Sequence, residues 1–278
     1  MSFTMSHLII AKNISDKYKD HIKNLPQFYL GSIAPDAAHN RADYISDFKK
    51  HSHLITGSEK WGMTTENDKW KDNIYNIFKK HTNSENHDFI LGYCTHALGD
   101  LYNNIAIWTA FREKYFKDKD WVYDNVHHRD SNRNDIELAL TYKDRDILWQ
   151  NLQMSVSIDF PDYIYASELD MQKELILNVW YKDKERPDIS LNKERTFEME
   201  LDFIEKATDY VSLAFKDLLN ENILDNLSVK DAVSDIVEES FEMAIDGTVA
   251  GEAIADGISE VTEAVIEKVT GFISGLIE

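Results

Sequence analysis

The chain has 278 residues, of which 43% are hydrophobic, so it is long and apolar enough to bury a sizeable core. Its formal net charge of −20 argues against binding of a nucleic-acid backbone as the main activity. The single cysteine, Cys94, excludes an internal disulfide and a thiolate zinc cluster. Only 4 prolines and 10 glycines, with few alternating β-branched runs, predict an all-α fold.

Apolar residues at helical spacing predict a multi-helical domain over residues 1–220. The first helix is expected to end before Pro26, and a following apolar run is interrupted at Pro35. The helices are expected over residues 6–25, 68–81, 89–116 (one helix or a pair), 135–154, 164–180 and 195–220. The longest segments between them are expected to be polar loops, over 41–58 and 117–134.

Composition changes at about residue 221. The segment 221–278 contains 14 acidic residues against two lysines, which accounts for −12 of the net charge of −20. Its apolar residues recur at a 4-3-4 spacing, which predicts an acidic amphipathic helical tail. Three arrangements are open for such a tail: packing on the domain, pairing with a second copy in a homo-oligomer, or lying on a membrane, where the acidic face disfavours anionic lipid.

The amino terminus shows no basic leader followed by a long apolar stretch, and no run of eighteen apolar residues occurs. We therefore expect a cytoplasmic protein without a transmembrane segment.

The most informative stretch is the predicted helix that begins near Phe89. His96 and Asp100 stand four residues apart, which places both side chains on one helix face. A buried imidazole and a buried carboxylate are costly unless they pair with each other or bind a metal. The remainder of that face is apolar or small, which predicts burial: Ile90, Leu91, Tyr93, Cys94, Ala97 and Leu101.

Further candidate ligands precede this pair in the sequence. Each lies at a predicted helix end or beside a chain break: His7, Asp36 and His53. Imidazole and carboxylate ligands together suit zinc or another borderline divalent ion. A carboxylate such as Asp100 can bridge two ions, an arrangement that supports hydrolysis of phosphoesters.

Four sequence pieces in this order resemble the zinc-dependent phospholipase C family, whose fold also serves single-strand-specific nucleases. They are H-L-I-I-A from His7, L-G-S-I-A-P-D ending at Asp36, S-H-L around His53, and I-L-G-Y-C-T-H-A-L-G-D ending at Asp100. The resemblance covers roughly residues 5–110, continues more weakly to about 220, and does not include the tail.

The resemblance implies a phospholipase C-like helical domain that cleaves a phosphoester with metal-activated water. A first zinc ion would be held by Asp36, His53, His96 and Asp100, and a second by His7 and the bridging Asp100. Asp36 would be the catalytic carboxylate that orients or deprotonates the water. From its position three residues after Asp36, His39 would be a further ligand, would hold a ligating carboxylate, or would only cap a turn. The expected substrate is a small phosphoester or a phospholipid.

Two positions depart from the family pattern. Six residues precede His7, so the family's terminal amine ligand is missing, and the position six residues after the bridging aspartate is Ala106 rather than histidine. The family's third metal site is therefore lost, unless His127 and His128 with Asp130 or Asp135 rebuild it. Because histidines in polar loops are usually solvated, we expect those two to lie at the surface, as we do His51.

Other interpretations remain open. A nuclease-type phosphodiesterase on the same fold is disfavoured by the net charge. The His87–Asp88 dipeptide is typical of HD-type phosphohydrolases, although Asn86 before it favours a helix N-cap. Asn103 and Asn104 follow the central pair by one turn, where they would hydrogen-bond a phosphate, orient a ligand or have no such role. The chain would otherwise be a metal-stabilised helical scaffold without catalysis.

Overall fold

The computed structural model describes residues 3–56, 59, 63–81, 83–115 and 125–219. The chain divides into two compact units, Met1–Leu219 and Asn220–Glu278. Every described residue belongs to the first unit, and the predicted acidic tail lies outside the described residues.

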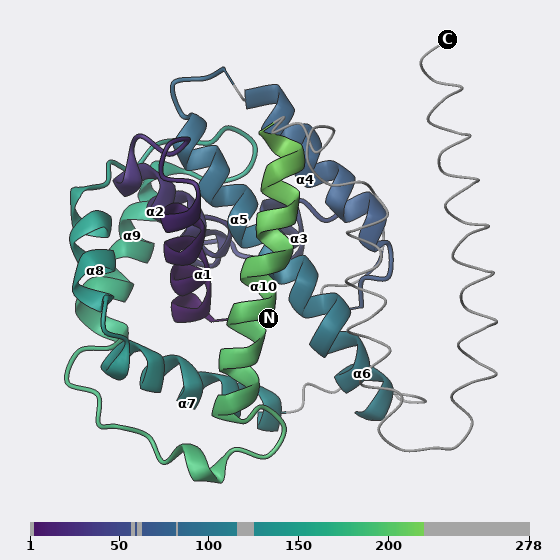
Figure 1. The fold of residues 1–278 in the computed structure, drawn as a ribbon, viewed down its shortest axis with the longest axis vertical. Helices are drawn as coiled ribbons and strands as arrows, with labels where there is room; N and C mark the ends of the chain where they lie inside the picture. The colour runs from purple at the N-terminus through teal and green to yellow at the C-terminus, as the bar shows by residue number, and fades with distance from the viewer. Residues whose placement is uncertain (1–2, 57–58, 60–62, 82, 116–124, 220–278) are drawn as a thin grey trace, which may run out of the picture. The chain divides into compact units, whose positions relative to one another are not determined.

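The all-α prediction is confirmed for the described part of the first unit, where helices dominate and β-structure is limited to one bridge between Phe160 and Ile164 (Figure 1). No helix in those ranges is both long and apolar enough to cross a membrane. The α-helices are α1 (Thr4–Lys17), α2 (Leu25–Ile33), α3 (Ser46–Ser52), α4 (Asn67–His81), α5 (His87–Asn103), α6 (Thr109–Tyr115), α7 (Asn125–Thr141), α8 (Arg145–Met154), α9 (Ala166–Glu174) and α10 (Phe197–Leu218). Shorter helical segments are the 3-10 helices η1 (Pro35–Asn40) and η4 (Ile189–Leu191) and the π-helices η2 (Asn104–Trp108) and η3 (Leu175–Trp180).

Helix α5 lies at the centre of the unit, with α1, α2, α4 and α10 packed around it (Figure 1). Nearly all of its side chains are buried, including the whole apolar face that the sequence predicts around His96. A helix that is apolar on every side is stable only inside a protein, which explains the central position of α5.

Two glycines set the distance between α2 and α5. A Cβ atom on Gly31 would lie 2.0 Å from the carbonyl oxygen of Phe89, and one on Gly92 would lie 1.9 Å from that of Phe28. Real Cβ atoms do not approach backbone oxygens this closely, so each helix contacts the other's backbone where a side chain would otherwise stand. This close approach brings the α2 backbone next to the His96 side of α5.

The start of α1 is held by acidic side chains from distant elements. Asp135 on α7 accepts a hydrogen bond from the Met5 N–H at 2.8 Å, and Glu200 on α10 accepts one from the Ser6 hydroxyl at 2.6 Å. Carboxylates are favourable at a helix amino terminus because they satisfy free N–H groups and the helix dipole. These two bonds fix the end of α1 that carries His7.

The predicted first helix, 6–25, is wrong at its end. Helix α1 stops at Lys17, and Pro26 lies in the first turn of α2 instead of terminating a helix. Proline is tolerated there because the first N–H groups of a helix need no partner inside it. The side chain of Asn24 caps this helix by accepting a bond from the Gln27 N–H.

The two predicted polar loops are also partly wrong. Segment 41–58 contains α3, and helix α7 begins at Asn125 within the segment 117–134, of which residues 117–124 lie outside the described residues. Buried polar side chains of α7 explain the second error, since the Asp130 carboxylate accepts bonds from the backbone N–H groups of Lys193, Glu194 and Arg195. The buried polar side chains of α7 therefore form hydrogen bonds inside the protein and are not exposed to solvent.

Several other predicted helices are confirmed. Helix α4 covers the predicted 68–81, and α9 with η3 covers most of 164–180. The predicted 89–116 is a near-continuous α5–η2–α6 run up to Tyr115, whereas the predicted 135–154 is divided into α7 and α8. Helix α10 lies within the predicted 195–220, and its buried face includes Phe203, Val211 and Phe215, whereas Leu201 is 47% exposed.

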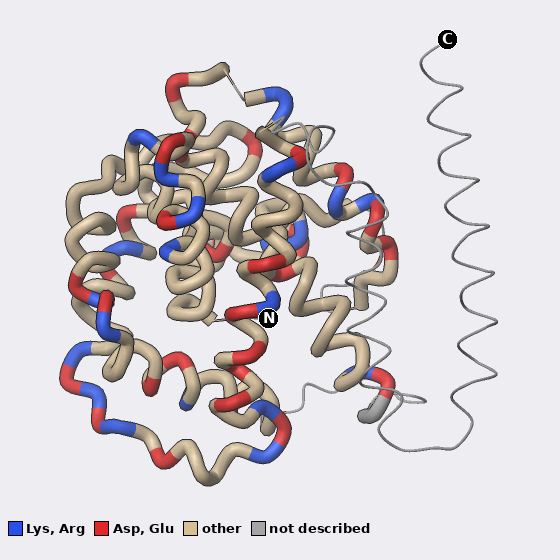
Figure 2. Tube along the Cα trace, viewed as in Figure 1, with Lys and Arg blue, Asp and Glu red and all other residues tan. Residues whose placement is uncertain are grey.

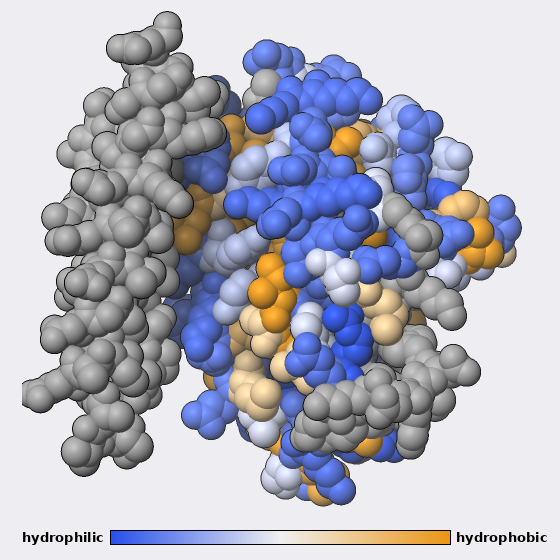
Figure 3. Space-filling view, turned by 90° about the vertical axis from the view of Figure 1, so that its right-hand side faces the viewer, coloured by the Kyte–Doolittle hydropathy of each residue, from blue (hydrophilic) through white to orange (hydrophobic). Residues whose placement is uncertain are grey.

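The surface of the first unit carries charges of both signs. In the view of Figure 2, Lys and Arg alternate with Asp and Glu along the outer segments instead of gathering in one basic face. The face shown in Figure 3 is largely hydrophilic, with its apolar residues in small separate groups. On the described residues visible in Figure 3, no broad apolar patch of the kind that binds membranes is present.

The close contact at Gly92 leads to a prediction about stability, for which Gly99 on the same helix is the control. We expect Gly92→Ala to lower the free energy of unfolding by about 2–3 kcal/mol or more, because its Cβ must push α2 away. Gly99→Ala should leave stability unchanged or raise it by about 0.5–1 kcal/mol, since its Cβ meets its nearest neighbour at 3.6 Å and alanine favours helix. Urea denaturation measures both, and equal effects of the two substitutions would contradict the proposed role of Gly92.

Candidate metal centre

The structure brings five of the six predicted ligands together. They come from four places in the fold: His7 on α1, Asp36 on η1, His53 directly after α3, and His96 with Asp100 on α5. Their ligand atoms form two groups whose members lie within 4.8 Å of one another: His7, His96 and Asp100 in one, and Asp36, His53 and His96 in the other. All but Asp36 are buried, and the two groups share His96.

Hydrogen bonds to backbone carbonyls orient two of the imidazoles. The Nδ1 atom of His96 lies 2.8 Å from the Ser32 carbonyl oxygen on α2, and the Nδ1 atom of His53 lies 2.8 Å from that of Lys49. A carbonyl oxygen only accepts, so both Nδ1 atoms carry the proton and the neutral rings present bare Nε2 atoms. Those Nε2 atoms face each other at 3.2 Å, where neither has a proton to donate to the other.

The two carboxylates add more acceptors around the same point. Asp36 places one oxygen 3.4 Å from the His53 Nε2 and the other 3.9 Å from the His96 Nε2. Asp100 lies between the groups, with one oxygen 3.4 Å from the His7 Nε2 and the other 3.5 Å from the His53 Nε2. The imidazole and carboxylate groups converge on one point, and backbone carbonyls hold two of the imidazoles in place. Borderline divalent ions bind such a set of ligands, so the residues fit zinc.

Burial and neighbouring charges set the protonation of the centre. Burial, with the adjacent His7, lowers the pKa of His96 to about 3. Burial alone would raise the pKa of Asp100, but its hydrogen bond with His7 and its attraction to the imidazoles of His7, His96 and His53 outweigh burial and lower that pKa. Both groups are therefore in their metal-binding forms near neutral pH, because ligands must be deprotonated to bind.

A left-handed residue directly follows His53 and ends α3. Leu54 has a φ of 64°, and its N–H bonds the His51 carbonyl while the Ile55 N–H bonds that of Lys50. This is the Schellman pattern, in which the left-handed position is normally glycine. A leucine there costs about 1–2 kcal/mol, and such strain persists only where surrounding contacts hold it. The Trp70 indole, which donates to the His53 carbonyl at 2.7 Å, is one such contact.

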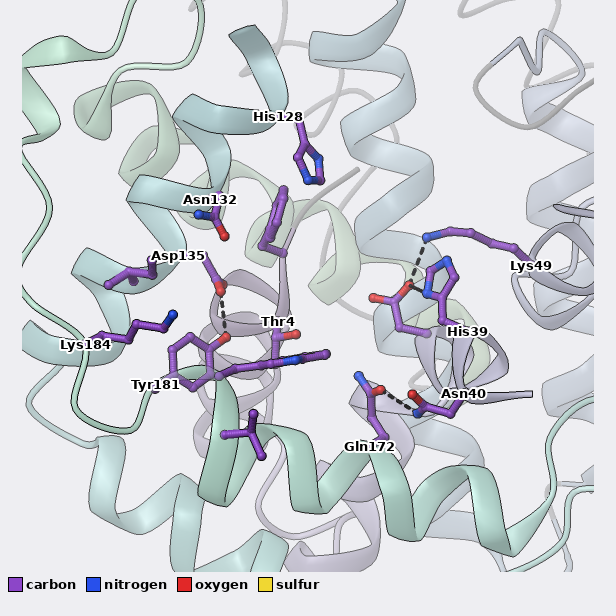
Figure 4. Close-up of a pocket in the computed structure, with 15 residues that line it drawn as sticks. Thr4, His39, Asn40, Lys49, His128, Asn132, Asp135, Gln172, Tyr181 and Lys184 are labelled. Atoms are coloured by element: carbon purple, nitrogen blue, oxygen red, sulfur yellow. Dashed lines mark hydrogen bonds and ion pairs between the residues drawn. The ribbon is translucent and has the colours of Figure 1, made fainter. Parts of the chain in front are cut away.

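A cavity of about 400 Å³ opens beside the centre (Figure 4). A gap in the packing beside it, too small for a water molecule and lined in part by His7 and His96, shares Thr4, Asp36 and Gln172 with the cavity. Asp36 therefore belongs to both the centre and the open cavity. Polar groups around the cavity wall include His39, Asn40, Lys49, His128, Asn132 and Lys184.

The sixth predicted ligand, His39, lies outside both groups. Its Nδ1 is 3.9 Å from an Asp36 oxygen, and its side chain is 42% exposed on the cavity wall. Burial and the charge of Lys49 lower its pKa to about 4. His39 is therefore a neighbour of Asp36 and is not one of the five side chains in the two ligand groups.

Other residues that the sequence singles out are also placed. His51 is exposed, as predicted, with its ring stacked on Tyr163, and Ala106 is exposed on η2. Asn104 donates to the Thr64 carbonyl and to the side chain of Asn67. Asp88 accepts from the backbone N–H groups of Lys23 and Asn24, and the His87–Asp88 pair belongs to neither ligand group of the described residues.

The alternative third site is not assembled within the described ranges. His127 is 5% exposed and enclosed by Trp108 and Phe111, which corrects the expectation of a solvated loop histidine. Asp130 binds backbone N–H groups, and Asp135 binds Met5 and the Tyr181 hydroxyl, so each carboxylate has a structural role. These side chains form no ligand group with His127 or His128.

Sequence reasoning missed three features of the centre: the Gly31–Gly92 approach, the strained Leu54, and Lys49. Glycines within apolar helical runs were an available signal for the first. Neither a left-handed leucine nor a buried lysine has a distinctive local pattern.

No protein-family model matches the chain, and no curated protein or solved structure matches it. The resemblance to zinc-dependent phospholipases C remains a prediction, so the geometry of the centre carries the functional argument.

The burial of His127 makes a prediction about acid stability. Its pKa falls from an ordinary 6.5 to about 3, because burial disfavours the charged ring. The unfolded chain then binds a proton that the folded chain does not, so this stabilisation is present above pH 6.5 and is lost as the pH falls toward 3. We expect His127→Phe to flatten the fall in unfolding free energy between these values, by up to about 1.4 kcal/mol per pH unit.

Urea denaturation at several pH values, with a metal chelator present throughout, measures this slope. His127→Gln should give the same shallower slope, which separates the charge effect from packing. Parallel pH profiles for the wild type and both variants would contradict the prediction.

Proposed function

We propose that the protein is a metal-dependent hydrolase of phosphoesters, of the phospholipase C type. The observation that carries the proposal is the convergence of five histidine and aspartate side chains beside an open cavity of about 400 Å³. Buried acceptors facing one another are costly unless a cation lies among them.

Four residues would hold the first ion: Asp36, His53, His96 and Asp100. His7, whose Nε2 lies 3.4 Å from the opposite oxygen of Asp100, marks the place for a second ion or a hydrogen bond to that carboxylate. Zinc is the ion that the imidazole–carboxylate set supports best. When bound, a divalent ion supplies a Lewis acid that polarises a phosphoryl oxygen and lowers the pKa of water.

The chain's own residues would position the reactants. Asp36 lines the open cavity, with 19% of its side chain exposed, so it would be the carboxylate that accepts a hydrogen bond from the attacking water. Partial burial would raise the pKa of Asp36, but the ammonium of Lys49 outweighs it and lowers that pKa well below the ordinary value, which keeps Asp36 an acceptor. This supports orientation of water by Asp36 more than strong general-base catalysis.

The cavity supports a small phosphoester or a phospholipid headgroup as the substrate. Its amide side chains and the buried ammonium of Lys49 suit a phosphate. Along the described segments drawn in Figure 2, Lys and Arg are interspersed with Asp and Glu, a charge pattern that disfavours a nucleic-acid backbone as the substrate.

The proposal predicts that Asp100→Asn loses both metal and activity. Zinc-loaded wild type should hydrolyse bis(4-nitrophenyl) phosphate, and the variant should show kcat/KM lower by at least roughly 100-fold, with less bound zinc. Asp47→Asn, the same change at an exposed position on α3, is the matched control and should behave as wild type. Unchanged hydrolysis by Asp100→Asn would contradict the site.

A further inference from the structure

Lys49 is a buried lysine whose ammonium lies at the edge of the candidate metal centre. The residue is 5% exposed, and its Nζ lies 3.1 Å from an Asp36 oxygen. Lys49 also lines the open cavity. In Figure 4 its amine lies beside His39, on the opposite side of the cavity from Lys184. A lysine is almost never this buried without a specific partner.

The backbone holds Lys49 in this position. Its carbonyl oxygen accepts the His53 Nδ1–H, so the residue contacts one proposed ligand through its main chain and another through its side chain. The Ser52 hydroxyl donates to the Pro35 carbonyl at 2.8 Å, which docks α3 onto η1. The positive charge is thereby fixed beside Asp36.

The ligand set itself favours one tightly held ion. Both candidate groups need the Nε2 of His96, and the other nitrogen of that ring is bonded to the Ser32 carbonyl. A single nitrogen binds one ion, so the two groups are not complete at the same time. If His96 binds the same ion as Asp36 and His53, that ion has four ligands once Asp100 is included. Only His7 and Asp100 then remain as ligands for a second ion.

Charge balance then gives Lys49 a role. The formal charges of two carboxylates and one divalent ion sum to zero, because the bound imidazoles are neutral. The ammonium raises the sum to one positive charge at the cavity edge, where an anionic phosphoryl group would enter. Ammonium groups bind phosphate oxygens as point charges.

We propose that the centre holds one tightly bound divalent ion and that Lys49 supplies the further positive charge by binding a phosphoryl oxygen of the substrate in the open cavity. The inference rests on the proposed function and assigns the anion-binding group of the same site. Lys49 is then a residue that touches the substrate, beyond its contact with Asp36.

Binding of inorganic phosphate to the zinc-loaded full chain tests this assignment without turnover. By isothermal titration calorimetry, Lys49→Met should keep one equivalent of zinc and raise the Kd for phosphate by roughly tenfold or more. Lys49→Arg should restore most of the affinity, since it keeps the charge. Lys184→Met is the matched control, because it removes an exposed lysine from the opposite wall of the same cavity and should bind phosphate like wild type.

Three results would overturn the inference alone: unchanged phosphate affinity in Lys49→Met, two tightly bound zinc ions in the wild type, or loss of zinc from Lys49→Met. The last would make Lys49 a structural partner of Asp36. Failure of the wild type to bind zinc would instead overturn the proposed function, and this inference with it.

Discussion

The close contact of α2 and α5 through Gly31 and Gly92 is the constraint on which the centre depends. Because neither position has a side chain, the α2 backbone approaches near enough for the Ser32 carbonyl to accept the His96 Nδ1–H. That bond turns the bare Nε2 toward His53 and the carboxylates. A wider separation of the two helices would still leave an all-α core, but it would remove the group that orients the central imidazole.

The same arrangement is costly in the absence of a cation. His53 and His96 direct bare nitrogens at each other, two carboxylates face them, and His7 stacks on His96 with ring centroids 3.6 Å apart. Folding tolerates such a cluster because surrounding bonds hold each member, as Asp135 and Glu200 do for α1 and the Schellman turn at Leu54 does for His53. The burial of the ligands, the fixed orientation of the imidazoles and the strain at Leu54 are typical of a binding site and do not stabilise the fold.

Sequence reasoning predicted the fold class and the five converging side chains, because the i, i+4 pair on α5 and the order of the other candidates are local signals. It failed where distant contacts override local polarity. The first part of α7, residues 125–134, is predicted as a loop because Asp130 looks like a surface residue until its three backbone partners from residues 193–195 are known. Pro26 was predicted to end a helix, although the cap from Asn24 makes it begin one. His39 and His53 are both candidate ligands in the sequence, and only the tertiary structure separates their positions.

The central claim is that these side chains bind a divalent metal, and zinc binding by equilibrium dialysis tests it most directly. The comparison is between His53→Ala and His51→Ala, the same change two residues apart, one in the centre and one exposed on α3. Wild type and His51→Ala should bind zinc equally, and His53→Ala should bind at least roughly tenfold more weakly. Equal zinc binding by all three proteins, or none by the wild type, would contradict the account.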